Sequence, residues 1–224
     1  MKLKNIYLFL IFLSLFSCKG EEDSYIYPSV KLEFLSAQTD ASGKIISLTT
    51  DKDATYSVEK DRTDSKLSVN TLQRIVCNYI VSEPADNSQN ASAVIYSLIK
   101  AVSPTPVKLA PGTQMKTDPV DIQSVWLSGH YINMTLQVML QSKTHLFHFI
   151  ETSTTIKNGV PSINLTLYHD KNDDVEAYTK IAYLSAPLDK YIQQYPNGFN
   201  VSMSIQTFND GVKTYTFTYP SSTI

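Results

Sequence analysis

Residues 199–219 read FNVSMSIQTFNDGVKTYTFTY, and this stretch decides the fold class. From Phe199 to Phe208 apolar and polar side chains alternate, which is typical of a strand with one buried face. The next residues, Asn209-Asp210-Gly211, belong to the types that accept the positive φ of a tight hairpin turn. Residues 212–219 then return with three aromatic side chains on one face. The stretch therefore predicts an antiparallel β-hairpin.

The same kind of pattern continues upstream in the second half of the chain. We expect strands at 122–127, 131–140, 145–151, 162–168 and 176–183. Two further hairpins are predicted, one turning through residues 141–144 and one through 169–174, and a short helix is expected within 187–195. Strands and turns at this spacing, with no long helical period, predict an antiparallel β-sandwich over residues 116–224.

The first half of the chain is also rich in strand patterns. Strands are expected at 30–38, 44–50, 55–58, 72–82 and 93–102, with a domain over residues 30–115. In the clearest of them, Ile75, Cys77, Tyr79 and Val81 share one face. Apolar residues make up 42% of the chain, which is enough to build a packed core. The predicted fold class is all-β.

The N-terminus, MKLKNIYLFLIFLSLFSCKG, has the features of an export signal. Two lysines precede an apolar run over residues 6–16, which is shorter than the ~20 residues that a membrane-spanning helix needs. The end of this run, Leu15-Phe16-Ser17-Cys18, resembles a bacterial lipobox. We therefore expect a signal peptide over residues 1–17 and a lipid on Cys18, and the alternative is an ordinary signal peptide.

Residues 18–29 are predicted to be an acidic tether. Glu21-Glu22-Asp23 follows the predicted lipidation site, and this pattern is similar to the surface-export signal of Bacteroidota lipoproteins. The alternative is a plain solvated tether. Lipid chains would anchor the protein to a membrane, because each buried methylene contributes about 0.8 kcal/mol. The expected location is the outer membrane, on the cell surface.

Several short patterns along the chain resemble the NigD-like lipoproteins. They are the lipobox, Arg74–Tyr79, Asp118–Val120 leading to Trp126–Ser128, Tyr131–Met134, His148–Ile150, Leu165–His169 and Lys213–Tyr219. The resemblance implies a five-stranded OB-like barrel in the N-terminal half and a β-sandwich in the C-terminal half. None of these patterns is a catalytic signature, so the resemblance implies a fold and a location but no reaction.

No common catalytic or cofactor motif is present in the sequence, including G-x-S-x-G, HExxH, the P-loop, GxGxxG and CxxC. We therefore expect a protein that is not an enzyme and has no cofactor. Residues 24–115 carry 9 basic and 9 acidic side chains, so an OB-like domain here lacks the positive groove that nucleic acid needs. Nucleic acid is excluded as an expected partner.

The densest group of oxygen ligands lies in the turn 169–176. Asp170, Asn172 and Asp174 have the spacing of the first three ligands of a calcium loop. Val175 and Ile181 occupy the positions where an EF-hand needs Gly and Glu, so an EF-hand is excluded. A looser calcium site is one prediction, and the alternative is a polar turn whose side chains bond their own backbone. The carboxylates are too close together to act as a glycosidase pair.

Four other side chains are of types that bind ligands or metal ions. Trp126 and Tyr131 are the candidate ligand-binding residues, because aromatic rings can stack on sugars; the alternative is that Trp126 fills the core. His145 and His148 are three apart on a predicted strand and should face opposite sides, so they cannot share a metal ion. We predict packing or surface roles for these histidines.

Three functions are compatible with these features. The first is a surface-anchored lipoprotein that binds a protein or glycan partner through its β domains without catalysis. The second is a glycan-processing enzyme or accessory of a surface uptake system. The third is an inhibitory or immunity-type partner of a secreted toxin.

Overall fold

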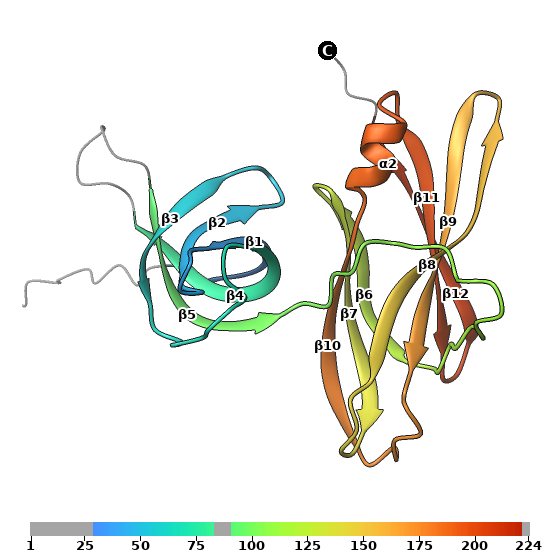
Figure 1. The fold of residues 1–224 in the computed structure, drawn as a ribbon, viewed down its shortest axis with the longest axis horizontal. Coiled ribbons are helices and arrows are strands. Elements are labelled where there is room, and N and C mark those ends of the chain that lie inside the picture. Colours follow the sequence, from blue (N-terminus) through green and yellow to red (C-terminus); the bar gives the residue numbers. More distant parts are fainter. Residues whose placement is uncertain (1–28, 83–90, 221–224) are drawn as a thin grey trace, which may run out of the picture.

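A computed structural model describes residues 29–82 and 91–220. The predicted signal peptide, Cys18 and nearly all of the tether lie outside the described residues. The chain forms two β-lobes, seen side by side in Figure 1 and joined by an extended segment. Within the described ranges, no helix is long and apolar enough to cross a membrane.

The first lobe is a closed five-stranded barrel, as expected. Its strands are β1 (Lys31–Thr39), β2 (Ile45–Thr50), β3 (Thr55–Asp61), β4 (Leu72–Ser82) and β5 (Ser92–Lys100). They close in the order β1-β2-β3-β5-β4. Alternate residues of β1 and β4, including Leu35, Ile75, Cys77 and Tyr79, fill the barrel interior and are fully buried. This confirms the predicted inward face of residues 72–82.

The second lobe is a β-sandwich of two sheets. Its elements are β6 (Asp121–Ser128), β7 (Tyr131–Leu140), β8 (Leu146–Lys157), β9 (Val160–Asp170), β10 (Tyr178–Pro187), α2 (Asp189–Gln194), β11 (Phe199–Thr207) and β12 (Gly211–Tyr219). One sheet has the order β10-β7-β6 and the other β12-β11-β9-β8. The alternation in β11 buries Phe199, Val201, Met203 and Ile205 between the sheets, and β11 and β12 form the predicted hairpin.

Two of the predicted hairpins are wrong. Strands β7 and β8 lie in different sheets, and so do β9 and β10, so the turns at 141–145 and 171–177 cross from one sheet to the other. Strand β8 instead forms a hairpin with β9, closed by Asn158 and Gly159, both with positive φ. Asn-Gly is the strongest short hairpin signal, so the sequence contained this turn. Within the sandwich β9 and β11 are parallel, because the chain passes through β10 of the other sheet and α2 before β11 returns beside β9.

The segment between the lobes runs along the sandwich. Val102 bridges β10 at Leu184, Val107 bridges β8 at Ile150, and Thr117 bridges β9 at His169. These contacts begin well before the boundary predicted between residues 115 and 116. We call residues 101–120 the strap, because they contact both sheets of the sandwich before entering β6.

Candidate functional site

The junction between the lobes brings charged, polar and aromatic side chains together. Alternate residues of β1 point into the barrel, so Phe34 and Ser36 lie on its outer surface. Arg74 of β4 lies on the same outer surface. These side chains meet the outer face of the sheet β10-β7-β6, the sheet nearer the barrel in Figure 1. The two faces enclose polar groups that neither lobe could bury alone.

Arg74 is the centre of this junction, and its side chain is 2% exposed. Nη2 pairs with Asp51 Oδ1 at 2.5 Å and lies 3.2 Å from Asn133 Oδ1, and Nε donates to Ser185 Oγ at 3.0 Å. Asn133 Nδ2 donates to the second oxygen of Asp51 at 2.8 Å, and Ser185 Oγ donates to Asn133 Oδ1 at 2.6 Å. Buried charge is tolerated when it is paired and fully hydrogen-bonded, so this network fixes one relative position of the two lobes.

Tyr131, a predicted ligand-binding residue, belongs to this network. Its ring centroid lies 3.9 Å from the guanidinium carbon of Arg74, and its hydroxyl is 3.4 Å from Ser36 Oγ. This is a cation–π stack in a desolvated setting. The ring of Tyr131 therefore stacks on the guanidinium group of Arg74 in the same chain.

Trp126, the second predicted residue, lies in a notch next to the network. The indole meets the Phe34 ring edge-to-face with centroids 5.4 Å apart, and Phe34 meets Tyr183 in the same way at 5.9 Å. The notch has a volume of about 300 Å³. Its lining combines three aromatic rings with aliphatic and polar side chains: Leu32, Glu33, Phe34, Asp51, Lys52, Val76, Trp126, Ser128, Thr135 and Tyr183. Tyr131 is not among them, so the two predicted residues do not share one platform.

Exposed apolar side chains continue from the notch onto both lobes. Leu32 in the notch wall is 64% exposed, Ile99 pairs with Val76 on the barrel and is also exposed, and Ile181 lies on the same face of β10 as Tyr183. A contiguous apolar surface with a polar rim is typical of a protein-binding site. The sequence did not reveal this surface, because its parts come from strands far apart in the chain.

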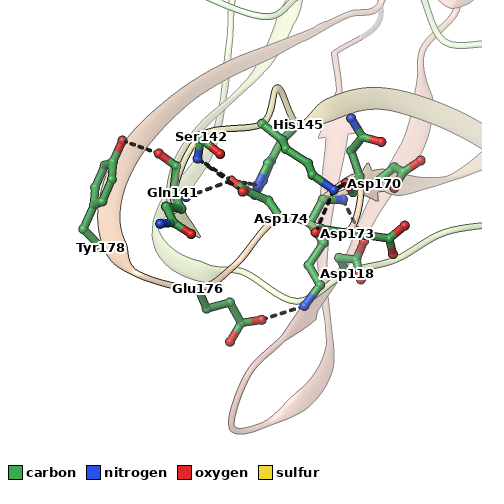
Figure 2. Close-up of polar contacts among 12 residues, drawn as sticks. Asp118, Gln141, Ser142, His145, Asp170, Asp173, Asp174, Glu176 and Tyr178 are labelled. Atoms are coloured by element: carbon green, nitrogen blue, oxygen red, sulfur yellow. Dashed lines mark hydrogen bonds and ion pairs between the residues drawn. The ribbon is translucent and has the colours of Figure 1, made fainter.

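Asp170 and Asp174, two of the candidate calcium residues, have their own protein partners (Figure 2). Asp170 pairs with Lys116 Nζ at 2.7 Å and accepts the Asn172 amide at 2.8 Å. Asp174 accepts the amides of Gln141 and Ser142. In the described part of the chain, no group of three or more His, Cys, Asp or Glu side chains is arranged to hold a metal ion. Calcium binding by this turn therefore stays a prediction.

The environment of Asp174 explains its charge. Burial acts to raise the pKa of this carboxyl group, but hydrogen bonds from backbone amides of 141–143 and of Val175 outweigh burial and lower the pKa to about 2. Asp174 thus joins the two loops that cross between the sheets, 141–145 and 171–177. Its ionised carboxylate accepts hydrogen bonds from backbone amides of both loops.

The histidines divide as predicted, with one addition. His148 is exposed, whereas the His145 side chain is only 4% exposed, so the two do face different surroundings. His169 was not predicted as a partner of His145, but its Nε2 lies 2.9 Å from His145 Nδ1. The signal was present, because His169 continues the buried alternation of Leu165 and Leu167 in β9.

Cys77 is a buried free thiol inside the barrel. Burial, with a smaller contribution from the charge of Asp61, raises its pKa to about 12. A thiol that stays protonated at neutral pH is a poor nucleophile, which agrees with the packing role inferred from its position in β4.

The chain is therefore a two-lobed all-β protein, in which a five-stranded barrel docks on a two-sheet sandwich through a buried arginine. Comparison with known proteins identifies the family. The model of the NigD-like C-terminal beta sandwich domain matches residues 103–219. A NigD-like immunity protein from Bacteroides caccae is 36% identical, with a TM-score of 0.68 over 88% of this chain and 99% of that one. The chain belongs to the NigD-like family.

More distant crystal structures share only the fold. A proposed toxin-related protein from Parabacteroides distasonis is 14% identical, with a TM-score of 0.68 over 87% of this chain and 95% of that one. A proposed lipoprotein from Bacteroides fragilis is 12% identical, with a TM-score of 0.60 over 87% of this chain and all of that one. No curated protein matched the chain.

Proposed function

We propose that this protein is a lipid-anchored, non-catalytic immunity-type protein that neutralises a secreted protein toxin by binding it at the interlobe notch. The observation that carries this proposal is the 36% identity to a NigD-like immunity protein along nearly the whole of both chains. The exposed apolar surface around Leu32 and Trp126 supports binding of a protein partner rather than a reaction.

A preformed notch suits this role. The Arg74 network is buried and paired, so the two walls of the notch are held in place before a partner arrives. Binding then costs little conformational entropy, because no lobe movement is needed. An apolar side chain of the partner would fill the space between Trp126, Phe34 and Tyr183, where aromatic anchors give most of the binding energy.

Deleting the gene tests the immunity function. The deletion strain is expected to become sensitive to concentrated culture supernatant of its own parent, and wild-type protein should restore resistance. Protease treatment of the supernatant should abolish killing if the partner is a protein. A deletion strain that stays as resistant as its parent would contradict the proposal.

Leu32→Glu locates the binding surface. A charge in the notch wall is expected to weaken binding by at least tenfold and to remove protection, since it must be desolvated against the partner. The matched control is Val212→Glu in β12, where the wild-type side chain is 62% exposed against 64% for Leu32. Equal protection by both variants would place the binding surface elsewhere.

Anchoring is tested separately by Cys18→Ala. The variant is expected to move from the membrane fraction to the soluble fraction, because the thiol that would carry the lipid is gone. Protease added to intact cells should remove the wild-type protein if it is displayed on the surface. Membrane retention of the Ala variant, or full protection of the wild type, would contradict lipidation or surface display respectively.

A further inference from the structure

The edges of the two sheets in the sandwich are protected unequally. A strand at the edge of a sheet presents unpaired backbone N–H and C=O groups, and folded proteins usually cover or interrupt such a row. The strap covers two of the edges, because the backbone of Val102 hydrogen-bonds to β10 and the backbone of Val107 hydrogen-bonds to β8. A third edge strand, β6, is interrupted by an irregular register between Ile122 and Ser124. The fourth edge strand is β12.

Strand β12 has none of these protections. Within residues 29–82 and 91–220 its only strand partner is β11, and their pairing runs from Gly211 to Tyr219 without a register shift. The strand contains no proline, and its one charged side chain, Lys213, forms an ion pair with Asp210 in the preceding turn. Most of its other residues are Val, Thr, Tyr and Phe, which favour extended structure. The outer edge of β12 therefore suits the addition of another extended strand.

The side chains of β12 define which strand fits this edge. Thr214, Thr216 and Thr218 are exposed on the outer face of the sheet, opposite polar residues of β11. Tyr215 and Phe217 lie on the inner face and are half-buried at the rim of the core. A strand that continues the sheet therefore needs neutral polar residues on one face and apolar or aromatic residues on the other. The sequence of β12 itself has this pattern.

We propose that β12 pairs with β12 of a second copy of this chain, in an antiparallel arrangement whose two-fold axis passes through Thr216. Thr214 then lies opposite Thr218 of the second copy, and Tyr215 lies opposite Phe217. Threonine pairs and aromatic pairs across antiparallel strands are stabilising. The two sheets of four strands join into one continuous sheet, and neither copy keeps an open edge at β12.

The backbone and the charge of β12 favour this register. Gly211 has a φ of +66°, so the extended part of the strand begins after it. An axis through Thr216 pairs residues 213–219 completely and places every threonine of β12 opposite a threonine. Lys213 falls opposite Tyr219 of the second copy, so its ammonium group meets an aromatic ring and not another cation. Pairing along one edge gives a small interface, so we expect the dimer to be reversible.

The pairing edge is separate from the interlobe notch. Strand β12 belongs to the sheet that does not face the barrel (Figure 1), and none of its residues lines the notch. Self-pairing through β12 therefore does not depend on the function proposed for the notch, and a bound toxin and a second copy of the chain would occupy different surfaces.

Disulfide trapping tests the register directly. The mature chain with Cys18→Ala keeps one native thiol, Cys77, which is buried in the barrel. Adding Thr216→Cys sets two thiols opposite each other across the axis, within reach of a disulfide. We expect mild oxidation to convert this variant to a covalent dimer. The matched control is Thr214→Cys, which is exposed on the same face but lies about 14 Å along the strands from its counterpart. It should crosslink at least tenfold more slowly.

Exchanging charges tests the pairing without added thiols. The Cys18→Ala chain is expected to dimerise in sedimentation equilibrium with a Kd of about 10–100 μM. In the like-charge variant, Thr214→Lys with Thr218→Lys, two lysines oppose each other twice, and the dimer should weaken at least tenfold. In the opposite-charge variant, Thr214→Lys with Thr218→Glu, each lysine meets a glutamate, and the Kd should return to within about threefold of the unsubstituted value. Both variants change the same exposed positions, so a folding defect does not explain a difference between them.

The outcomes separate self-pairing from the other possible occupant of the edge, a strand of the toxin. A chain that stays monomeric up to about 1 mM would overturn self-pairing, and so would equal crosslinking at 214 and 216 or equal association of the two charge variants. The like-charge variant is expected to protect the deletion strain as well as the wild type does, because its notch is unchanged. If the wild type is monomeric and the like-charge variant no longer protects, the edge binds a strand of the toxin instead.

Discussion

Replacing Arg74 with methionine is expected to lower the free energy of unfolding by about 3–5 kcal/mol, the cost of removing one partner from a buried ion pair. Methionine fills much of the same space but has no donor, so the loss is electrostatic rather than a cavity. Asp51 is left with a nearly buried negative charge, and Asn133 and Ser185, both fully buried, each lose a hydrogen bond. No other cation contacts Asp51 among the ion pairs of the described residues.

The single tryptophan makes this effect measurable at the junction itself. Trp126 packs against Phe34 across the two lobes, so its fluorescence reports lobe docking, whereas circular dichroism reports the strands. Urea unfolding of the wild type should give coincident transitions by both probes. In Arg74→Met the fluorescence transition is expected to come first, because the lobes separate before they unfold.

The matched control is Arg62→Met. Arg62 is exposed and stacks on Tyr96 at the barrel surface, with its guanidinium carbon 4.8 Å from the ring centroid. Its loss should cost about 0.5–1 kcal/mol and leave the two probes coincident. A similar loss in both variants would mean that Arg74 contributes no more than a surface cation.

Sequence patterns predicted which residues form strands better than they predicted which strands pair with each other. The β11–β12 hairpin was predicted correctly because its turn is short and the turn residues fix the backbone locally. The errors at 141–145 and 171–177 have a common cause, since a polar turn between two amphipathic strands looks the same whether the chain folds back or crosses to the facing sheet. What decides between them is long-range packing, here the contact of Asp174 with the amides of Gln141 and Ser142.

The junction was invisible in the sequence for a related reason. Alternation in β4 places Arg74 on the outer face, where an arginine is normally solvated. Its burial depends on Asn133 and Ser185, which lie in strands of the other lobe. Trp126 and Tyr131 were predicted as ligand-binding residues from their aromatic rings. Only the fold shows that Trp126 lines the notch and that Tyr131 stacks on the Arg74 side chain.

Gly129→Ala is the second substitution with a large expected effect, because Gly129 packs directly against the backbone of the other lobe. Gly129 follows β6 in the turn to β7 and has a φ of +53°. A Cβ at this position would lie 2.6 Å from the Asp51 carbonyl oxygen. Both sides of this contact are backbone, so neither can rotate away as a side chain would.

The comparison with Gly159→Ala separates backbone strain from the clash between lobes. Gly159 also lies in a hairpin turn with positive φ, but a Cβ there would meet nothing within 4 Å. Its replacement should cost about 1–2 kcal/mol from the left-handed backbone alone. Gly129→Ala should cost about 1–3 kcal/mol more, the typical penalty of overpacking, and should shift the Trp126 emission toward that of an exposed indole.

Combining Gly129→Ala with Arg74→Met tests whether both changes act on one junction. Asp51 contributes its carboxylate to the Arg74 network and its carbonyl to the Gly129 contact, so the two losses share a residue. Once the lobes have separated in one variant, the second change has less docking left to remove. The double variant should therefore lose less stability than the sum of the single losses, by about 1 kcal/mol or more. If the losses in the free energy of unfolding were strictly additive, the two sites would stabilise the docking of the lobes independently. The notch would then not be held in place by one cooperative set of contacts.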